Sequence, residues 1–175
     1  DYKQSPRVEQ LVEDMLYMLW DLGLKVGHAT RSVEDCIRLS KQDNTICTAI
    51  LESRYLWVEK AFFTELRQKF NKQIIEGQGR RFLEAKLAER DERHKRMGDS
   101  RYVVEPNVKD GKGGLRDLQT MWWIAHYLYG DLTRDTMVAD DMLTTSENRQ
   151  FRKAKSFLWT VRVALHFLAD RAEER

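Results

Sequence analysis

Hydrophobic residues recur every three or four positions along most of the chain, which is the spacing of one face of an α-helix. The first such run is bounded by Pro6, which suits a first helical turn, and by Gly23, which suits a stop. Its apolar positions are Val8, Leu11, Val12, Met15, Leu16, Leu19 and Leu22. The pattern predicts one amphipathic helix between Pro6 and Gly23.

A short apolar segment, residues 24–29, follows this run and predicts a buried strand. Ser32 and Asp35 then predict the start of a second helix, because serine caps helix N-termini and an acid suits the first turn. Beyond Asp43 the strand signals vanish and helical intervals return. These intervals predict two more helices, through Ile46, Ile50 and Trp57, then Phe62, Leu66, Phe70 and Ile74.

Gly77 and Gly79 interrupt the helical pattern, and we place a domain boundary there, between residues 1–76 and 77–175. A charged helical run follows up to Gly98. Leu115, Leu118, Trp122, Ala125 and Tyr129 predict a helix that ends at Gly130. Thr144 and Glu147 form the signature of a capping box for a last helix, whose apolar seam runs from Phe151 to Leu168. The expected fold is mainly α, a helical bundle with a small α+β remnant near the N-terminus.

Charge and cysteine content narrow the function classes. Thirty Lys and Arg against 28 Asp and Glu leave a net charge of +2, so nucleic acid is not an expected partner. No apolar run reaches the roughly 18–20 residues needed to span a bilayer, so no membrane association is expected. Cys36 and Cys47 lack a spacing typical of zinc ligands or of a disulfide framework, which favours a reduced cytoplasmic setting.

The most unusual segment is residues 105–117, in which three glycines and three cations precede a helix. The cations are Lys109, Lys112 and Arg116, and the glycines are Gly111, Gly113 and Gly114. Glycines let backbone N–H groups approach an anion, and a helix N-terminus favours negative charge, so the segment is a candidate phosphate site. Its spacing is not that of a P-loop. The alternative interpretation is a surface turn in which Asp117 complements the helix dipole.

Two further groups of polar residues have helical spacing. Arg90, Arg93, His94 and Arg96 could point toward the glycine-rich segment or form a solvated charged face. Arg162, His166 and Asp170 follow one another at intervals of four and could form a surface network. The four histidines have no metal-binding spacing, so no metal ligand is expected in this chain. The carboxylates of Asp43 and Glu52 could bind a metal or cap and pair within their helix, and capping is the expected role of Asp43.

Several short motifs, in this order and spacing, resemble the PII uridylyltransferase family. They are Leu-Trp-Asp at 19–21, Val-Gly-His-Ala-Thr-Arg at 26–31, Glu-Pro-Asn at 105–107 and Gly-Gly-Leu-Arg-Asp at 113–117. Asp43, residues 51–54, Arg93 with His94, and Arg162 with residues 165–166 also resemble the family. The resemblance covers roughly residues 15–175.

The resemblance implies a bifunctional enzyme that transfers UMP from UTP to a tyrosine of the PII signal protein and that removes it with another domain. It implies Mg²⁺ held by a Gly-Ser pair and an Asp-x-Asp motif upstream of the first helix. The chain contains neither a Gly-Ser dipeptide nor an Asp-x-Asp motif. We therefore expect a fragment that is inactive alone. Residues 1–76 would end the nucleotidyltransferase domain, with 24–57 completing its palm, and 77–175 would be its helical companion. Lys25 stands where some relatives carry a palm glutamate.

The resemblance also points to a substrate site in this chain. The candidates for nucleotide or substrate binding are Lys109, Gly113, Gly114, Arg116, Arg93 and His94, whereas the catalytic residues are unknown. Uridylyl removal and glutamine sensing would belong to other domains. Two alternatives stay open: a nucleotidyltransferase with another protein acceptor, and a non-catalytic helical interaction module that docks through Trp122, Trp123 and Tyr127.

Overall fold

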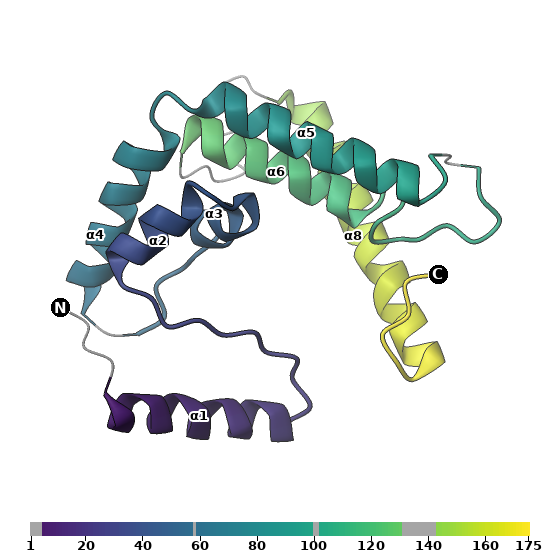
Figure 1. Ribbon diagram of the computed structural model, residues 1–175. Coiled ribbons are helices and arrows are strands. Elements are labelled where there is room, and N and C mark those ends of the chain that lie inside the picture. The colour runs from purple at the N-terminus through teal and green to yellow at the C-terminus, as the bar shows by residue number, and fades with distance from the viewer. Residues whose placement is uncertain (1–4, 58, 100–101, 131–142) are drawn as a thin grey trace.

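A computed structural model describes residues 5–57, 59–99, 102–130 and 143–175 of the chain. Its regular structure within these residues is helical, with no strand, which confirms the mainly α prediction (Figure 1). The helices are α1 (Pro6–Asp21), α2 (Val33–Ser40), α3 (Asn44–Leu51), α4 (Lys60–Phe70), the π-helix η1 (Asn71–Ile75), α5 (Gly79–Arg96), α6 (Leu115–Tyr129) and α8 (Thr145–Ala169).

Side-chain caps begin several of these helices where the sequence predicts them. Ser32 Oγ accepts a hydrogen bond from the Asp35 backbone N–H at 3.0 Å and starts α2. Asp43 Oδ1 accepts from the Thr45 N–H at 2.6 Å and starts α3. Thr144 and Glu147 form the predicted capping box of α8. These caps satisfy backbone donors that a helix N-terminus otherwise leaves unpaired.

One hydrophobic cluster joins helices from both sides of Gly77. It comprises Ile37, Cys47, Leu51, Phe70, Ile74, Phe82 and Tyr127. The rings of Phe82 and Tyr127 stack with centroids 3.9 Å apart, and the Tyr127 hydroxyl donates to the Ile74 carbonyl at 2.5 Å. Burial raises the pKa of Tyr127 to about 12. Helices α2, α3 and α4 therefore share a core with α5 and α6, while the division into two domains at residue 77 stays a prediction.

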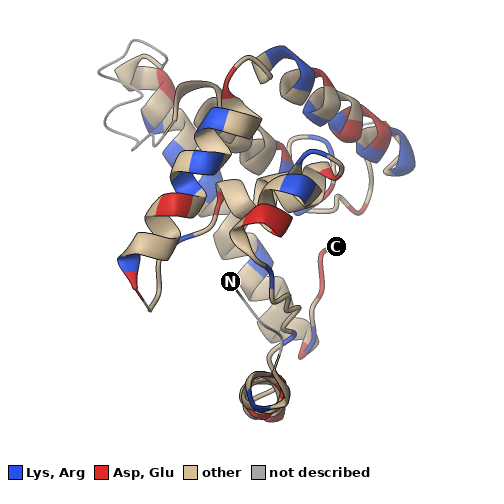
Figure 2. Cartoon of the chain, turned by 60° about the vertical axis from the view of Figure 1, so that its left-hand side comes forward, with Lys and Arg blue, Asp and Glu red and all other residues tan. Residues whose placement is uncertain are grey.

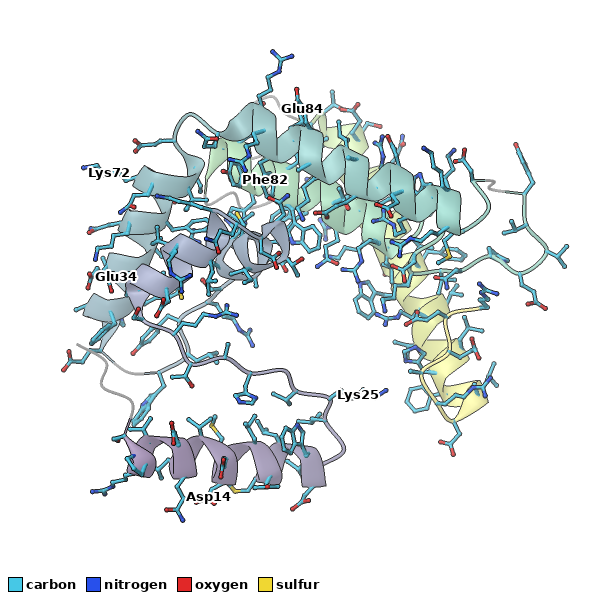
Figure 3. The ribbon with its side chains drawn as sticks, viewed as in Figure 1. Asp14, Lys25, Glu34, Lys72, Phe82 and Glu84 are labelled. Atoms are coloured by element: carbon cyan, nitrogen blue, oxygen red, sulfur yellow. The ribbon has the colours of Figure 1, made fainter. Side chains whose placement is uncertain are left out.

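Helix α1 lies apart from the other helices. Figures 1 and 2, which view the chain from directions 60° apart, both show it separate from the bundle. Leu16 is its buried residue, whereas most of its other apolar side chains are exposed. The segment after α1 contains no strand, so the prediction for residues 24–29 is wrong. A strand needs a partner for its backbone groups, and the described residues supply none. Lys25 is exposed in this segment (Figure 3).

The predicted helix through Phe62 and Ile74 is a composite of two types. The α-helix α4 ends at Phe70 and continues as the π-helix η1, which ends before Gly77 at φ 72°. Trp57 lies outside the helices and is 86% exposed, so its predicted place on a helical face is wrong. Ile74, within this π-helix, is buried in the core cluster.

The later helices form the part of the bundle that carries the site. Helices α5 and α6 run side by side, and α8 packs against α6 (Figure 1). None of the α8 side chains that the structure describes is fully buried; the predicted seam is half-buried at Phe151, Leu158, Val161 and Leu165. No helix among the described residues is both long and apolar enough to cross a membrane.

Candidate functional site

Residues 107–114, directly before α6, fold into a compact turn. The Asn107 side-chain oxygen accepts hydrogen bonds from the backbone N–H groups of Lys109 (3.0 Å) and Asp110 (2.7 Å). The Asn107 carbonyl accepts from the Gly111 N–H at 3.0 Å. Such side-chain mimicry of a backbone turn is typical of asparagine. Asn107 therefore organises the predicted glycine-rich loop.

Two of the glycines are required by the geometry of this turn. Gly113 has φ 83°, a region that side chains with a Cβ atom rarely adopt. A Cβ atom on Gly114 would lie 2.9 Å from each of three backbone oxygens, those of Val108, Lys109 and Gly111. Gly113 and Gly114 thus serve the closure of the loop itself. Their part in binding a substrate stays a prediction.

Asp117, in the first turn of α6, occupies the position at which the sequence suggests an external anion. It accepts hydrogen bonds from the Gly113 N–H (2.7 Å), from His94 Nε2 (2.9 Å) and from the Arg93 guanidinium. Burial alone would raise the pKa of Asp117, but these hydrogen bonds outweigh it and lower the pKa below the usual 3.8. Three of the candidate residues, Arg93, His94 and Gly113, therefore lie together in the structure. The anion that they bind is the carboxylate of Asp117.

Arg116 points to the other side of α6 and is held by several neighbours. Its guanidinium donates to the Gln119 side chain at 2.8 Å, lies 3.5 Å from Asp110 and stands 5.9 Å from the Trp123 ring centroid. Lys86, which is only 2% exposed, stands 5.2 Å from the same ring. Trp123 therefore contacts two cations and helps to fix the direction of Arg116.

A cavity of about 470 Å³ opens between α6, α8 and the loop. Its basic lining residues are Lys109, Arg116, Lys155 and Arg162, against one acid, Glu52. Its aromatic lining residues are Trp122, Phe151 and Trp159. Arg162 lies over the Trp159 ring, with the guanidinium carbon 5.1 Å from the centroid. Cations beside aromatic walls suit a ligand that combines an anionic group with a flat ring.

The structure therefore separates the six predicted candidates into two groups along α6. Lys109 and Arg116 line the cavity between α6 and α8. Arg93, His94 and Gly113 surround Asp117, and Gly114 starts α6. The aromatic docking face predicted for the interaction module is divided in the same way, because Tyr127 is buried in the core and Trp122 lines the cavity.

Sequence reasoning missed three residues of the cavity region. Lys155, Trp159 and Arg162 follow one another at spacings of four and three residues, so they share one face of α8. That periodicity could have identified Lys155 and Trp159. Glu174 accepts two hydrogen bonds from Arg162, at 2.9 and 2.7 Å. No spacing signal indicates this contact, since Glu174 follows the end of α8. Arg162 and His166 thus meet Glu174 rather than the predicted Asp170.

The described residues contain no group of three or more His, Cys, Asp or Glu side chains that could hold a metal ion. The magnesium ion that the resemblance implies therefore finds no ligand set among them. The chemistry that this part of the chain can supply is the binding and orientation of an anionic ligand by its cations.

Comparison with known proteins shows which family the chain resembles. A family model described as GlnD PII-uridylyltransferase matches residues 81–175, which include every lining residue of the cavity except Glu52. Bifunctional uridylyltransferase/uridylyl-removing enzymes are 61% identical in Azospirillum brasilense and 59% identical in Rhodospirillum rubrum, each over 174 residues and 99% of this chain. The enzyme of that name from Rhodopseudomonas palustris is 53% identical over the same length.

The chain spans 19% of the length of each of these three relatives. No solved structure matches it. The family match extends over more than half of the chain and includes α5 from residue 81 onward, the glycine-rich loop, α6 and α8. The chain belongs to the GlnD PII-uridylyltransferase family.

Proposed function

We propose that the complete protein is a bifunctional uridylyltransferase/uridylyl-removing enzyme, which transfers UMP from UTP to a tyrosine of the PII signal protein and removes it again. The observation that carries this proposal is the 61% identity to a protein of that name across 99% of the chain. The residues of this chain form a helical part of that enzyme. By themselves they are inactive, because the described residues offer no metal ligand set for nucleotidyl transfer.

The contribution of this part, in our proposal, is to hold the nucleotide in the cavity between α6 and α8. Lys109 and Arg116 contact its phosphates, and Trp122 and Trp159 contact its ring. The cavity supports this assignment by its four cations, its aromatic walls and its volume of about 470 Å³, which is within the range of small-molecule sites. Fixed cations beside a transferring phosphoryl group stabilise the charge on its oxygens without reorganisation.

The setting of the enzyme in this proposal is the cytoplasm, and its metal ion is Mg²⁺. Cys36 and Cys47 are both free and buried, which supports a reducing compartment. Mg²⁺ would neutralise phosphate charge during the transfer, held by residues outside the described ones. UTP and the PII protein are the proposed partners of the complete enzyme.

The direct test is an assay of the complete protein with UTP labelled in its α-phosphate, PII protein and Mg²⁺. The expected result is one labelled uridylyl group on each PII acceptor tyrosine, with no transfer by the 175-residue chain alone. An enzyme that labels a different protein and leaves PII unlabelled would contradict the proposed acceptor. An enzyme that labels no protein would contradict the activity.

A further inference from the structure

The carboxylate of Glu174 lies where three basic side chains converge. Arg162 donates two hydrogen bonds to it, Lys109 Nζ lies 3.6 Å from Oε1, and His166 Nε2 lies 3.9 Å from the same oxygen. The backbone carbonyl of Glu174 accepts a hydrogen bond from the Val108 N–H at 2.9 Å. The segment after α8 is thus docked against the glycine-rich loop through both its backbone and its side chain.

The carboxylate satisfies this cluster incompletely. Only the Arg162 contacts are within hydrogen-bonding distance, because the separations to Lys109 and His166 are too long. His166 Nε2 is buried and has no hydrogen-bond partner among the described residues. A buried ring nitrogen without a partner costs free energy, so His166 Nε2 can pair with an added anionic oxygen. The cluster can therefore bind more anionic oxygens than Glu174 supplies.

This cluster is continuous with the cavity between α6 and α8. Lys109 and Arg162 line the cavity and also face Glu174. Glu174 itself is 20% exposed at its side chain, so solvent and ligands can reach it. Burial by itself would raise the pKa of Glu174, but the hydrogen bonds from Arg162 and the nearby charge of Lys109 outweigh it and lower the pKa.

We propose that Lys109, Arg162 and His166 form an anion subsite of this cavity, filled here by the Glu174 carboxylate and taken over by a phosphate group when the nucleotide binds. The subsite rests on the proposed function for the identity of its ligand. A phosphate carries more charge and one more terminal oxygen than a carboxylate. It can therefore reach Arg162, Lys109 and His166 together, whereas the carboxylate bonds to Arg162 and leaves the other two at a longer distance.

Glu174 thereby becomes an internal competitor that keeps the nucleotide affinity below its limit. A phosphate must first displace a carboxylate held by two charge-assisted hydrogen bonds, which are the stronger class of hydrogen bond. Removing the charge of Glu174 while keeping the shape of its side chain removes this competition. The direction of the effect is unusual for a substitution beside a binding site, because the substitution improves binding.

The experiment is a calorimetric titration of the complete protein with UTP, pyrophosphate and uridine. Glu174→Gln is expected to bind UTP and pyrophosphate on the order of tenfold more tightly than the unsubstituted protein. Uridine, which has no phosphate, is expected to bind the two proteins equally. Glu173→Gln is the matched control, since the Glu173 carboxylate pairs with Arg171 and with the backbone N–H groups of Glu174 and Arg175, not with the three basic side chains; its UTP affinity is expected to be unchanged. Arg162→Met is expected to weaken UTP binding.

Several results would overturn the subsite. Equal UTP affinity in Glu174→Gln and the unsubstituted protein would remove Glu174 as a competitor while leaving the proposed function intact. An equal gain for uridine would show that the substitution only opens space. Complete absence of UTP binding in both proteins would overturn the subsite and the nucleotide site together. Glu174→Asp keeps the charge, and its UTP affinity is expected to stay within about twofold of the unsubstituted protein; a gain as large as that of Glu174→Gln would contradict competition by charge.

Discussion

Asp117 and His94 join the start of α6 to the end of α5, with His94 Nε2 2.9 Å from Asp117 Oδ1. Asp117 lies at a helix N-terminus, whose partial positive charge its carboxylate complements. Arg93 and the Gly113 N–H bind the same carboxylate. The pair therefore fixes the glycine-rich loop between the two helices and sets the position of Lys109 and Arg116.

Replacing this carboxylate by an amide is expected to weaken the fold. In Asp117→Asn the Arg93 guanidinium loses its anionic partner, and the loss of charge-assisted hydrogen bonds should lower the free energy of unfolding by about 2–3 kcal/mol. Denaturant unfolding of the complete protein measures the change. Asp99→Asn is the control, because the Asp99 carboxylate that pairs with Lys112 is exposed and screened by solvent, so its loss should lower the free energy of unfolding much less.

The same carboxylate predicts a loss of stability in acid. Because the pKa of Asp117 is lower in the folded than in the unfolded chain, its contribution is fully present above the unfolded value, close to 3.8. It is lost as the pH falls below 3.8 and through the lower folded pKa. The difference in free energy of unfolding between the unsubstituted protein and Asp117→Asn should therefore shrink as the pH falls from 7 toward 2.5. A difference that stays constant across this range would contradict the linkage.

Gly114 is expected to tolerate no side chain. The added Cβ of Gly114→Ala would meet three backbone oxygens at 2.9 Å, and backbone atoms move less readily than side-chain tips. We expect the free energy of unfolding to fall by about 3 kcal/mol, measured by thermal unfolding. Gly27→Ala, where nothing lies within 4 Å, should change it by less than about 0.5 kcal/mol. Equal effects at the two positions would contradict the close packing of the loop.

Local sequence signals predicted where the helices lie, but they did not predict which helices contact one another. Ser32 with Asp35 and Thr144 with Glu147 are interactions within one turn, so their residue types suffice to locate a helix start. The apolar run at 24–29 has the composition of a strand, but a strand also needs a partner strand, which no local pattern reveals. Leu24 is 51% exposed in consequence.

Local sequence patterns were also insufficient to predict the contacts of the candidate site. The glycines and cations of residues 105–117 were identifiable by type, and Lys109 and Arg116 do line a cavity. The sequence left two interpretations of this segment open, a phosphate site and a turn with Asp117 at the helix N-terminus, and in the structure the Asp117 carboxylate accepts the hydrogen bond of the Gly113 N–H. Glu174 reaches Lys109 across 65 positions of the chain, a pairing that depends on how the segment after α8 docks. Neither arrangement has a periodic signature.

Trp122 offers a test that separates binding from stability. Because it is half-buried at the cavity, Trp122→Ala should cost less than the roughly 3–5 kcal/mol typical of a core tryptophan. It should weaken UTP binding by roughly tenfold if its ring contacts the base, since one such contact contributes about 1–3 kcal/mol. Phe157→Ala removes an aromatic residue of α8 that is 65% exposed and outside the cavity, and UTP affinity should not change. A large loss of stability with unchanged UTP affinity would place Trp122 in the core instead.

The most direct test of the nucleotide site is the UTP affinity of Arg116→Ala in the complete protein, measured by titration alongside the rate of UMP transfer to PII. The account predicts UTP binding weakened by roughly tenfold or more in a protein that still folds cooperatively, because Arg116 lines the cavity from a helix that other contacts hold. Arg80→Ala, which removes a cation that is 91% exposed on α5, should leave both affinity and rate unchanged. Unchanged UTP affinity and UMP transfer in Arg116→Ala would contradict the placement of the nucleotide in this cavity.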